Sequence, residues 1–107
     1  MDAYFPVCQA DALPAGTCKS FDVAGHLIIV AHLKDGFHAV GNRCTHLDSR
    51  LSTERIYHGG QIACPIHGAR FDLRTGAAKS PPAFRPLALF PVRVREGQVE
   101  VMLRPVR

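Results

Sequence analysis

Hydrophobic residues in this chain alternate with polar ones over short runs that are bounded by turn residues. The richest run, His26–Leu33, contains several β-branched residues and is followed by Asp35-Gly36 and then by Phe37–Val40. A two-residue Asp-Gly between such runs favours a type I′ hairpin, because that turn needs positive φ at both central positions. The pattern therefore predicts paired antiparallel strands.

Two further turn signals, Ala24-Gly25 and Glu96-Gly97, separate runs of the same kind. Helical signals are weak: Asp11–Leu13 is long enough for one turn before Pro14. Prolines throughout 77–91 exclude a helix there and indicate a loop that leads into the last hairpin. The expected strands are Tyr4–Cys8, Thr17–Val23, His26–Leu33, Phe37–Val40, Gln61–Ala63, Leu89–Arg95 and Gln98–Leu103.

These elements predict an all-β fold, an antiparallel β-sandwich or barrel with protected edges, formed by a single domain over residues 1–107. Residues 41–76 break the alternating pattern, since they are rich in Gly, Arg, Cys and His and contain one short strand-like piece. A long segment with little regular structure inside a compact domain is usually functional. We expect the chemistry to lie there.

Composition narrows the class of protein. The chain is 47% hydrophobic and 21% charged, so a packed core is expected and bulk disorder is not. No apolar run is long enough for a membrane span, and no export signal is visible at the N-terminus. We therefore expect a cytoplasmic protein with reduced thiols, whose basic charge (pI ≈ 9.2) suits an acidic partner.

Two Cys/His pairs stand in this segment, Cys44-Thr45-His46 and Cys64-Pro65-Ile66-His67, separated by residues 47–63. Zinc accepts two Cys and two His, but its sites usually place Cys with Cys and His with His. A binuclear centre suits the spacing better, because one pair then supplies a thiolate to an inner iron and an imidazole to an outer iron. Two His replace two Cys on one iron in this way in some [2Fe–2S] centres.

The two motifs Cys44-x-His46 and Cys64-x-x-His67-Gly68, in a β-rich chain of this length, resemble the signature of Rieske-type iron–sulfur proteins. The likeness covers the whole chain, and residues 64–76 resemble the ferredoxins of bacterial aromatic-ring-hydroxylating dioxygenases. It implies a Rieske fold with a small cluster-binding subdomain, about 41–76, built from two loops. It also implies one [2Fe–2S] cluster, with Cys44 and Cys64 on the buried iron and His46 and His67 on the outer one.

The same resemblance implies a function in aromatic hydrocarbon catabolism. The chain would carry one electron at a time from an NAD(P)H-dependent flavoprotein reductase to a terminal Rieske non-haem iron oxygenase that dihydroxylates aromatic compounds. It would be an electron-transfer component and not an enzyme itself, a monomer with no nucleic-acid or membrane partner. Alternatives are the small subunit of an assimilatory nitrite reductase and a zinc-stabilised binding module.

The chain departs from the high-potential Rieske proteins that it resembles. It lacks the extra cysteine that each cluster loop of those proteins carries, and it has Ala69 and Phe71 where they have a serine and a tyrosine that donate to sulfur. Fewer donors to sulfur leave the reduced cluster less stabilised, which lowers the reduction potential.

The remaining candidates have ordinary interpretations. Cys8 and Cys18 are expected to be thiols in the core and not disulfide halves. Asp48 either hydrogen-bonds a cluster histidine or is a solvated carboxylate, and Arg43, Arg50 and Arg70 either contact a partner or are solvated. Positions 41, 68 and 76 are expected to be glycine turns. The histidines expected not to bind metal are His26, His32, His38 and His58.

Charge is distributed unevenly along the chain. The whole formal excess of +4 lies within residues 43–85, and cations and anions balance elsewhere. A basic rim around the cluster histidines would steer an acidic partner toward the site of electron exit, whereas cations scattered over the surface would not.

Overall fold

The computed structural model describes residues 3–41, 56, 60–63, 70–79 and 87–104. Apart from one 3₁₀ turn, η1 (Ala10–Ala12), the regular elements in these ranges are strands. They are β1 (Tyr4–Gln9), β2 (Thr17–Val23), β3 (His26–Leu33), β4 (Gly36–Gly41), β5 (Gln61–Ala63), β6 (Arg70–Asp72), β7 (Leu89–Phe90), β8 (Val92–Arg95) and β9 (Gln98–Met102). The all-β prediction is confirmed.

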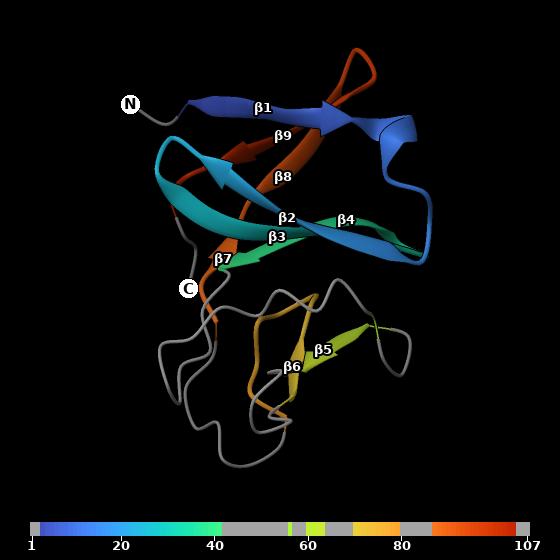
Figure 1. The fold of residues 1–107 in the computed structure, drawn as a ribbon, viewed down its shortest axis with the longest axis vertical. Helices are drawn as coiled ribbons and strands as arrows, with labels where there is room; N and C mark the ends of the chain where they lie inside the picture. The colour runs from blue at the N-terminus through green and yellow to red at the C-terminus, as the bar shows by residue number, and fades with distance from the viewer. Residues whose placement is uncertain (1–2, 42–55, 57–59, 64–69, 80–86, 105–107) are drawn as a thin grey trace.

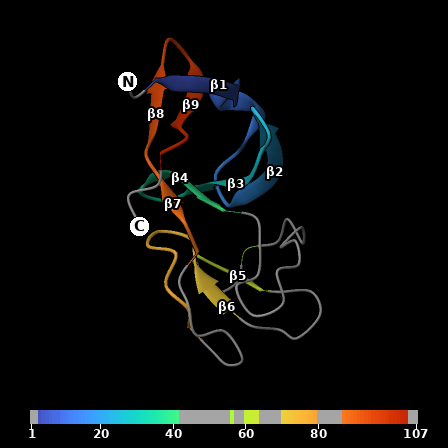
Figure 2. The same cartoon turned by 90° about the vertical axis from the view of Figure 1, so that its left-hand side faces the viewer.

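The strands form three antiparallel sheets, with the orders β1-β9-β8, β2-β3-β4-β7 and β5-β6. Figure 1 shows the four-stranded sheet between the other two, and the perpendicular view in Figure 2 shows the same order. The small β5–β6 sheet therefore lies at one end of the molecule, and the three-stranded sheet lies at the other.

Strand β3 is buried on both faces and divides the core in two. Ile28 and Val30 face one way and pack with Val99 and Val101 of the three-stranded sheet. Alternate residues point to opposite faces of a strand. The other face of β3, carrying Ile29, Ala31 and Leu33, therefore packs with residues of and beside the β5–β6 sheet, namely Ile62, Phe71 and Leu73. This explains why the β3 run is almost continuously hydrophobic.

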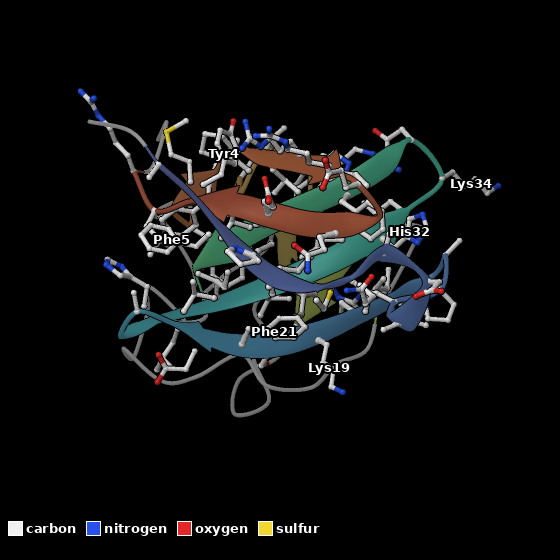
Figure 3. All side chains as sticks on the ribbon, turned by 90° about the horizontal axis from the view of Figure 1, so that it is seen from above. Tyr4, Phe5, Lys19, Phe21, His32 and Lys34 are labelled. Carbon is white, nitrogen blue, oxygen red and sulfur yellow. The ribbon has the colours of Figure 1, made fainter. Side chains whose placement is uncertain are left out.

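Two of the three predicted type I′ turns are confirmed by their backbone. Ala24 and Gly25 have φ of 50° and 85°, and Glu96 and Gly97 have φ of 52° and 79°. The prediction at Asp35-Gly36 was wrong by one residue. Gly36 already pairs with Leu33, so Lys34 and Asp35 form the turn, and neither has positive φ. Figure 3 shows Lys34 at this turn, pointing away from the sheets.

Two elements differ from the sequence prediction by more than one residue at an end. The expected strand Leu89–Arg95 is divided at Pro91: β7 pairs with β4, and β8 pairs with β9 in another sheet. Proline lacks the N–H that a continuous ladder needs, so the chain leaves one sheet and enters the other at this residue. The short strand β6 was not predicted at all, because its pattern of Arg, Phe and Asp is too short to be distinguished from a loop.

The segment that contains η1 packs against β3. The single turn expected at Asp11–Leu13 forms one residue earlier, as η1. Leu13 is buried behind it, and its carbonyl oxygen lies 2.7 Å from Nδ1 of His32 on β3. The His32 ring stacks on Phe37 of β4, with 4.1 Å between ring centroids. His32 is thereby held by the residue after η1 and by an aromatic neighbour in its own sheet.

Candidate metal centre

All four predicted cluster ligands, Cys44, His46, Cys64 and His67, lie outside the described residues. The structure does describe the elements on either side of them. Strand β4 ends at Gly41, before the first Cys/His pair, while β5 ends at Ala63 and β6 begins at Arg70, on either side of the second pair. These elements form the framework that supports the two Cys/His segments.

The β5–β6 sheet supports the second pair. Ala63 pairs with Arg70, so residues 64–69 connect two strand ends that are hydrogen-bond neighbours. One register step further, Ile62 pairs with Phe71, and both side chains are fully buried. Burying a side chain of this size stabilises the fold by about 1.5–3 kcal/mol, so the base of the second Cys/His connection is firmly anchored.

The first pair follows β4, whose end is anchored in the same core. Val40 is fully buried and belongs to the same hydrophobic cluster as Ile62 and Phe71. The N–H of Gly41 donates to the carbonyl oxygen of Ala88 at 2.9 Å. Both Cys/His segments are therefore attached to one packed framework, although they are far apart in the sequence.

A series of backbone hydrogen bonds joins β6 to Leu87, two residues before β7. The N–H of Asp72 donates to Ala77 O at 2.9 Å, and the N–H of Gly76 donates to Asp72 O at 2.7 Å. The N–H of Leu87 in turn donates to Gly76 O at 2.7 Å. The Asp72 carboxylate also accepts a 2.7 Å hydrogen bond from the N–H of Arg74, which fixes the turn after β6.

Gly76 is a turn residue, as the sequence predicts. Its φ is +78°, which L-residues rarely adopt, and a Cβ at this position would lie 2.5 Å from the carbonyl oxygen of Leu87. The turn predicted at Gly41 is wrong: Gly41 has no positive φ and is the last residue of β4, and a Cβ there would make only an ordinary contact with Ala88. Gly68 lies outside the described residues.

An ion pair joins this framework to the main sheet. Nε of Arg74, just after β6, donates to Oδ2 of Asp35 at 3.0 Å, and Asp35 lies in the turn between β3 and β4. The other carboxylate oxygen is 3.1 Å from Nε2 of His38. The Arg74 hydrogen bond, followed by that of His38, lowers the pKa of Asp35 from 3.8 to about 2. Asp35 is thus a carboxylate at neutral pH.

Sequence reasoning missed this contact. Asp35 was interpreted only as a turn residue, and Arg74 lies 39 positions away from it. No local periodicity relates two residues at that separation, and both types are common on surfaces, so no signal in one sequence could have paired them.

The described residues outside the two motifs do not form a competing metal site. No group of three or more His, Cys, Asp or Glu suitable for a metal occurs among them. Neither Cys8 nor Cys18 forms a disulfide, as predicted. Cys18 is buried, and Cys8 is half-buried. Burial raises the pKa of the Cys8 thiol, although the charge of Lys19 acts in the opposite direction. A raised pKa disfavours the thiolate form that metals bind.

The donor set of the two motifs, two thiols and two imidazoles, suits a [2Fe–2S] centre of mixed Cys/His ligation. Phe71 follows the second motif, is completely buried and has no hydroxyl. It therefore contributes packing and no hydrogen bond to sulfur. His58, Asp48, Arg43, Arg50 and Ala69 lie outside the described residues.

The described cations of the proposed basic rim have different environments. Lys79 is exposed, Arg70 is half-buried, and Arg74 is paired with Asp35. Of these three, Lys79 is the one that best fits a rim residue available to a partner.

Comparison with known proteins agrees with this framework. The sequence profile described as "Rieske [2Fe-2S] domain" matches residues 3–91. The chain is 36% identical over 99 residues to ferredoxin CarAc of Metapseudomonas resinovorans, and the aligned region covers 92% of each chain. It is 33% identical over 95 residues to the 3-phenylpropionate/cinnamic acid dioxygenase ferredoxin subunit of Photorhabdus laumondii, covering 89% of this chain and 90% of that one.

A solved structure has the same fold. One chain of the complex of reduced oxygenase and oxidised ferredoxin in carbazole 1,9a-dioxygenase superposes with a TM-score of 0.89 at 33% identity. The match covers 97% of this chain and 96% of that one. The similarity is therefore nearly end to end. No helix among the described residues is long and apolar enough to cross a membrane.

Proposed function

We propose that this chain, which belongs to the Rieske [2Fe–2S] domain family, is the ferredoxin component of an aromatic-ring dioxygenase system. The observation that carries the proposal is the nearly full-length similarity to ferredoxin subunits of such dioxygenases. Because those relatives are ferredoxin subunits, the chain is an electron carrier and not itself the enzyme. The same relatives favour this function over the nitrite reductase subunit and the zinc module.

Residues of this chain would hold the cluster from two sides. In the proposal, Cys44 and Cys64 ligate the inner iron, and His46 and His67 ligate the outer iron. A [2Fe–2S] cluster held in this way takes up and releases one electron. The β5–β6 pair and the end of β4 supply the two supports, both anchored in the core that contains Val40, Ile62 and Phe71. The cluster-binding subdomain within the single domain 1–107 is about 41–76.

The proposed electron acceptor is a terminal Rieske non-haem iron oxygenase that dihydroxylates an aromatic compound. The superposed ferredoxin fold comes from a complex with an oxygenase, which supports this choice of partner. The proposed donor is an NAD(P)H-dependent flavoprotein reductase, as the resemblance to dioxygenase ferredoxins implies. The proposal also includes a monomeric state and a cytoplasmic location, where Cys8 and Cys18 would stay reduced.

Reconstitution tests the function directly. The purified chain is mixed with a flavoprotein ferredoxin reductase, NADH and a terminal oxygenase of the carbazole type, and dihydroxylated product is measured. We expect product to depend on the chain and to disappear with a Cys64→Ser variant. An iron–sulfur chain that the reductase reduces but that passes no electron to any aromatic-ring oxygenase would contradict the proposal, as would a colourless protein that contains zinc.

A further inference from the structure

Arg74 connects three segments that the sequence keeps apart. Its Nε donates to Asp35 in the β3–β4 turn at 3.0 Å. Its guanidinium also lies against Gly60, the residue before β5, where a Cβ would force the Arg74 side chain to move. The neighbouring residue Leu73 donates its N–H to the carbonyl oxygen of Gly60 at 2.7 Å. One turn therefore holds the start of β5 against the end of β6, at the end of this sheet away from residues 64–69, and Asp35 joins that turn to the four-stranded sheet.

Asp35 uses both carboxylate oxygens. Oδ2 accepts from Arg74, and Oδ1 lies 3.1 Å from Nε2 of His38 on β4. The side chain of Asp35 is 52% exposed, so water screens the pair and its contribution to overall stability is modest. Its geometry is nevertheless directional, which distinguishes it from an apolar contact between the two sheets.

That apolar contact is the packing of Ile62 and Phe71 against β3 and β4. Hydrophobic burial is non-directional and by itself fixes the separation of the sheets better than their relative orientation. A charged hydrogen bond between Arg and a carboxylate adds an orientational restraint, beside the backbone hydrogen bond from Leu87 N–H to Gly76 O. The β5–β6 sheet flanks residues 64–69, which contain Cys64 and His67.

We propose that Asp35, acting through Arg74, is a positioning residue for the β5–β6 sheet and thereby for the second Cys/His pair of the cluster. The inference rests on the proposed function, since it takes Cys64 and His67 as ligands. Asp35 contacts neither of them in this scheme. It sets the orientation of the strands from which they extend.

The chain offers a matched control. Nε of Arg93 and Oε1 of Glu100 form an ion pair of 2.7 Å between β8 and β9, in the sheet at the opposite end of the molecule. Asp35→Asn and Glu100→Gln make the same change of charge, and each breaks an Arg–carboxylate pair. Glu100→Gln therefore controls for the loss of a carboxylate and of an arginine pair at a place that does not touch the β5–β6 sheet.

The experiment compares the iron-loaded variants with the wild type. Hydrogen exchange is followed by mass spectrometry in peptides covering 60–63 and 70–79, with a peptide covering β3 as reference. We expect about threefold faster exchange in the β5–β6 peptides of Asp35→Asn, as a partly exposed ion pair warrants, and no such change in Glu100→Gln. We also expect shifted g-values in the electron paramagnetic resonance spectrum of reduced Asp35→Asn only.

The Arg74→Gln variant distinguishes an effect of strand orientation on the cluster from an effect of the lost charge alone. Loss of a nearby anion and loss of a nearby cation shift a reduction potential in opposite directions, whereas both variants break the same contact. Positioning therefore predicts that Asp35→Asn and Arg74→Gln change the g-values in the same sense. Wild-type g-values in both variants, with full iron content, would overturn the proposal.

Two further measurements keep the outcomes separate. If Asp35→Asn does not fold, Asp35→Glu, which retains the charge, is expected to restore exchange and spectrum toward the wild type, and a Glu variant as altered as Arg74→Gln would overturn the inference. Failure of the proposed ligands is recognised differently, by a Cys64→Ser variant that keeps its cluster.

Discussion

Gly76 packs against the carbonyl oxygen of Leu87, and a Cβ at position 76 would lie 2.5 Å from that oxygen. The same two residues share a 2.7 Å hydrogen bond from Leu87 N–H to Gly76 O. This contact holds the turn after β6 against the segment that leads into β7. Backbone atoms approach so closely here because glycine leaves room for them.

Substituting this glycine tests the contact. Gly76→Ala combines strain at φ +78° with a collision against backbone, and we expect a loss of about 2–4 kcal/mol in the free energy of unfolding. Gly25→Ala is the control, because Gly25 has φ +85° but nothing within 4 Å of its Cβ position. It should cost about 1 kcal/mol. Urea unfolding measures both, and equal losses would contradict this account of Gly76.

Ligation is tested by serine substitutions. Cys44→Ser and Cys64→Ser should lose the cluster, because serine does not replace a thiolate on iron, and should destabilise the segment that the cluster joins. Cys8→Ser and Cys18→Ser should retain full iron and sulfide content. Iron and sulfide analysis decides between them, and a Cys44 variant that keeps its iron beside a Cys8 variant that loses it would refute the assignment.

The reduction potential should be near the low end of the Rieske range, roughly −150 mV, because positions 69 and 71 carry no hydroxyl. Ala69→Ser combined with Phe71→Tyr should raise it. Phe71 is fully buried, so an unsatisfied tyrosine hydroxyl would also cost about 1–3 kcal/mol of stability. Protein-film voltammetry gives the potential, and a wild-type value well above zero would exclude this explanation.

Acid should weaken the contribution of Asp35 to stability. Its pKa is lowered to about 2 in the folded protein, so the stabilisation is fully present above the ordinary value of 3.8 and is lost as pH falls toward 2. The difference in unfolding free energy between wild type and Asp35→Asn should therefore shrink between pH 5 and pH 3. Circular dichroism during urea titration measures it; a difference that grows on acidification would contradict the lowered pKa.

Partner association should depend on salt if a basic rim steers it. Electron transfer to the oxygenase should slow as ionic strength rises, because charges are screened within about 8 Å at physiological salt. Arg50→Glu and Arg70→Glu should slow it more than Arg104→Glu. Lys79→Glu is a cleaner test than Arg70→Glu, since Lys79 is exposed and Arg70 is half-buried. Stopped-flow rates that are indifferent to salt and to these sites would exclude the rim.

The sequence alone determined the strand class and most strand positions. Local patterns suffice there: alternation sets which residues face the core, and Ala24-Gly25 and Glu96-Gly97 adopt the positive φ that their turns require. The Cys/His motifs could also be recognised from the sequence, because metal chemistry restricts the type and spacing of the ligand residues. The ligand assignment remains a prediction, since those residues lie outside the described part of the chain.

Only the tertiary structure decided which elements meet. The division at Pro91 depends on two different sheets offering partners to β7 and β8, and the pairing of β6 depends on the core around Phe71. The contact of Asp35 with Arg74 links a turn to a residue 39 positions away. Such contacts depend on three-dimensional packing between distant segments, so a local pattern of hydrophobic and polar residues cannot predict them.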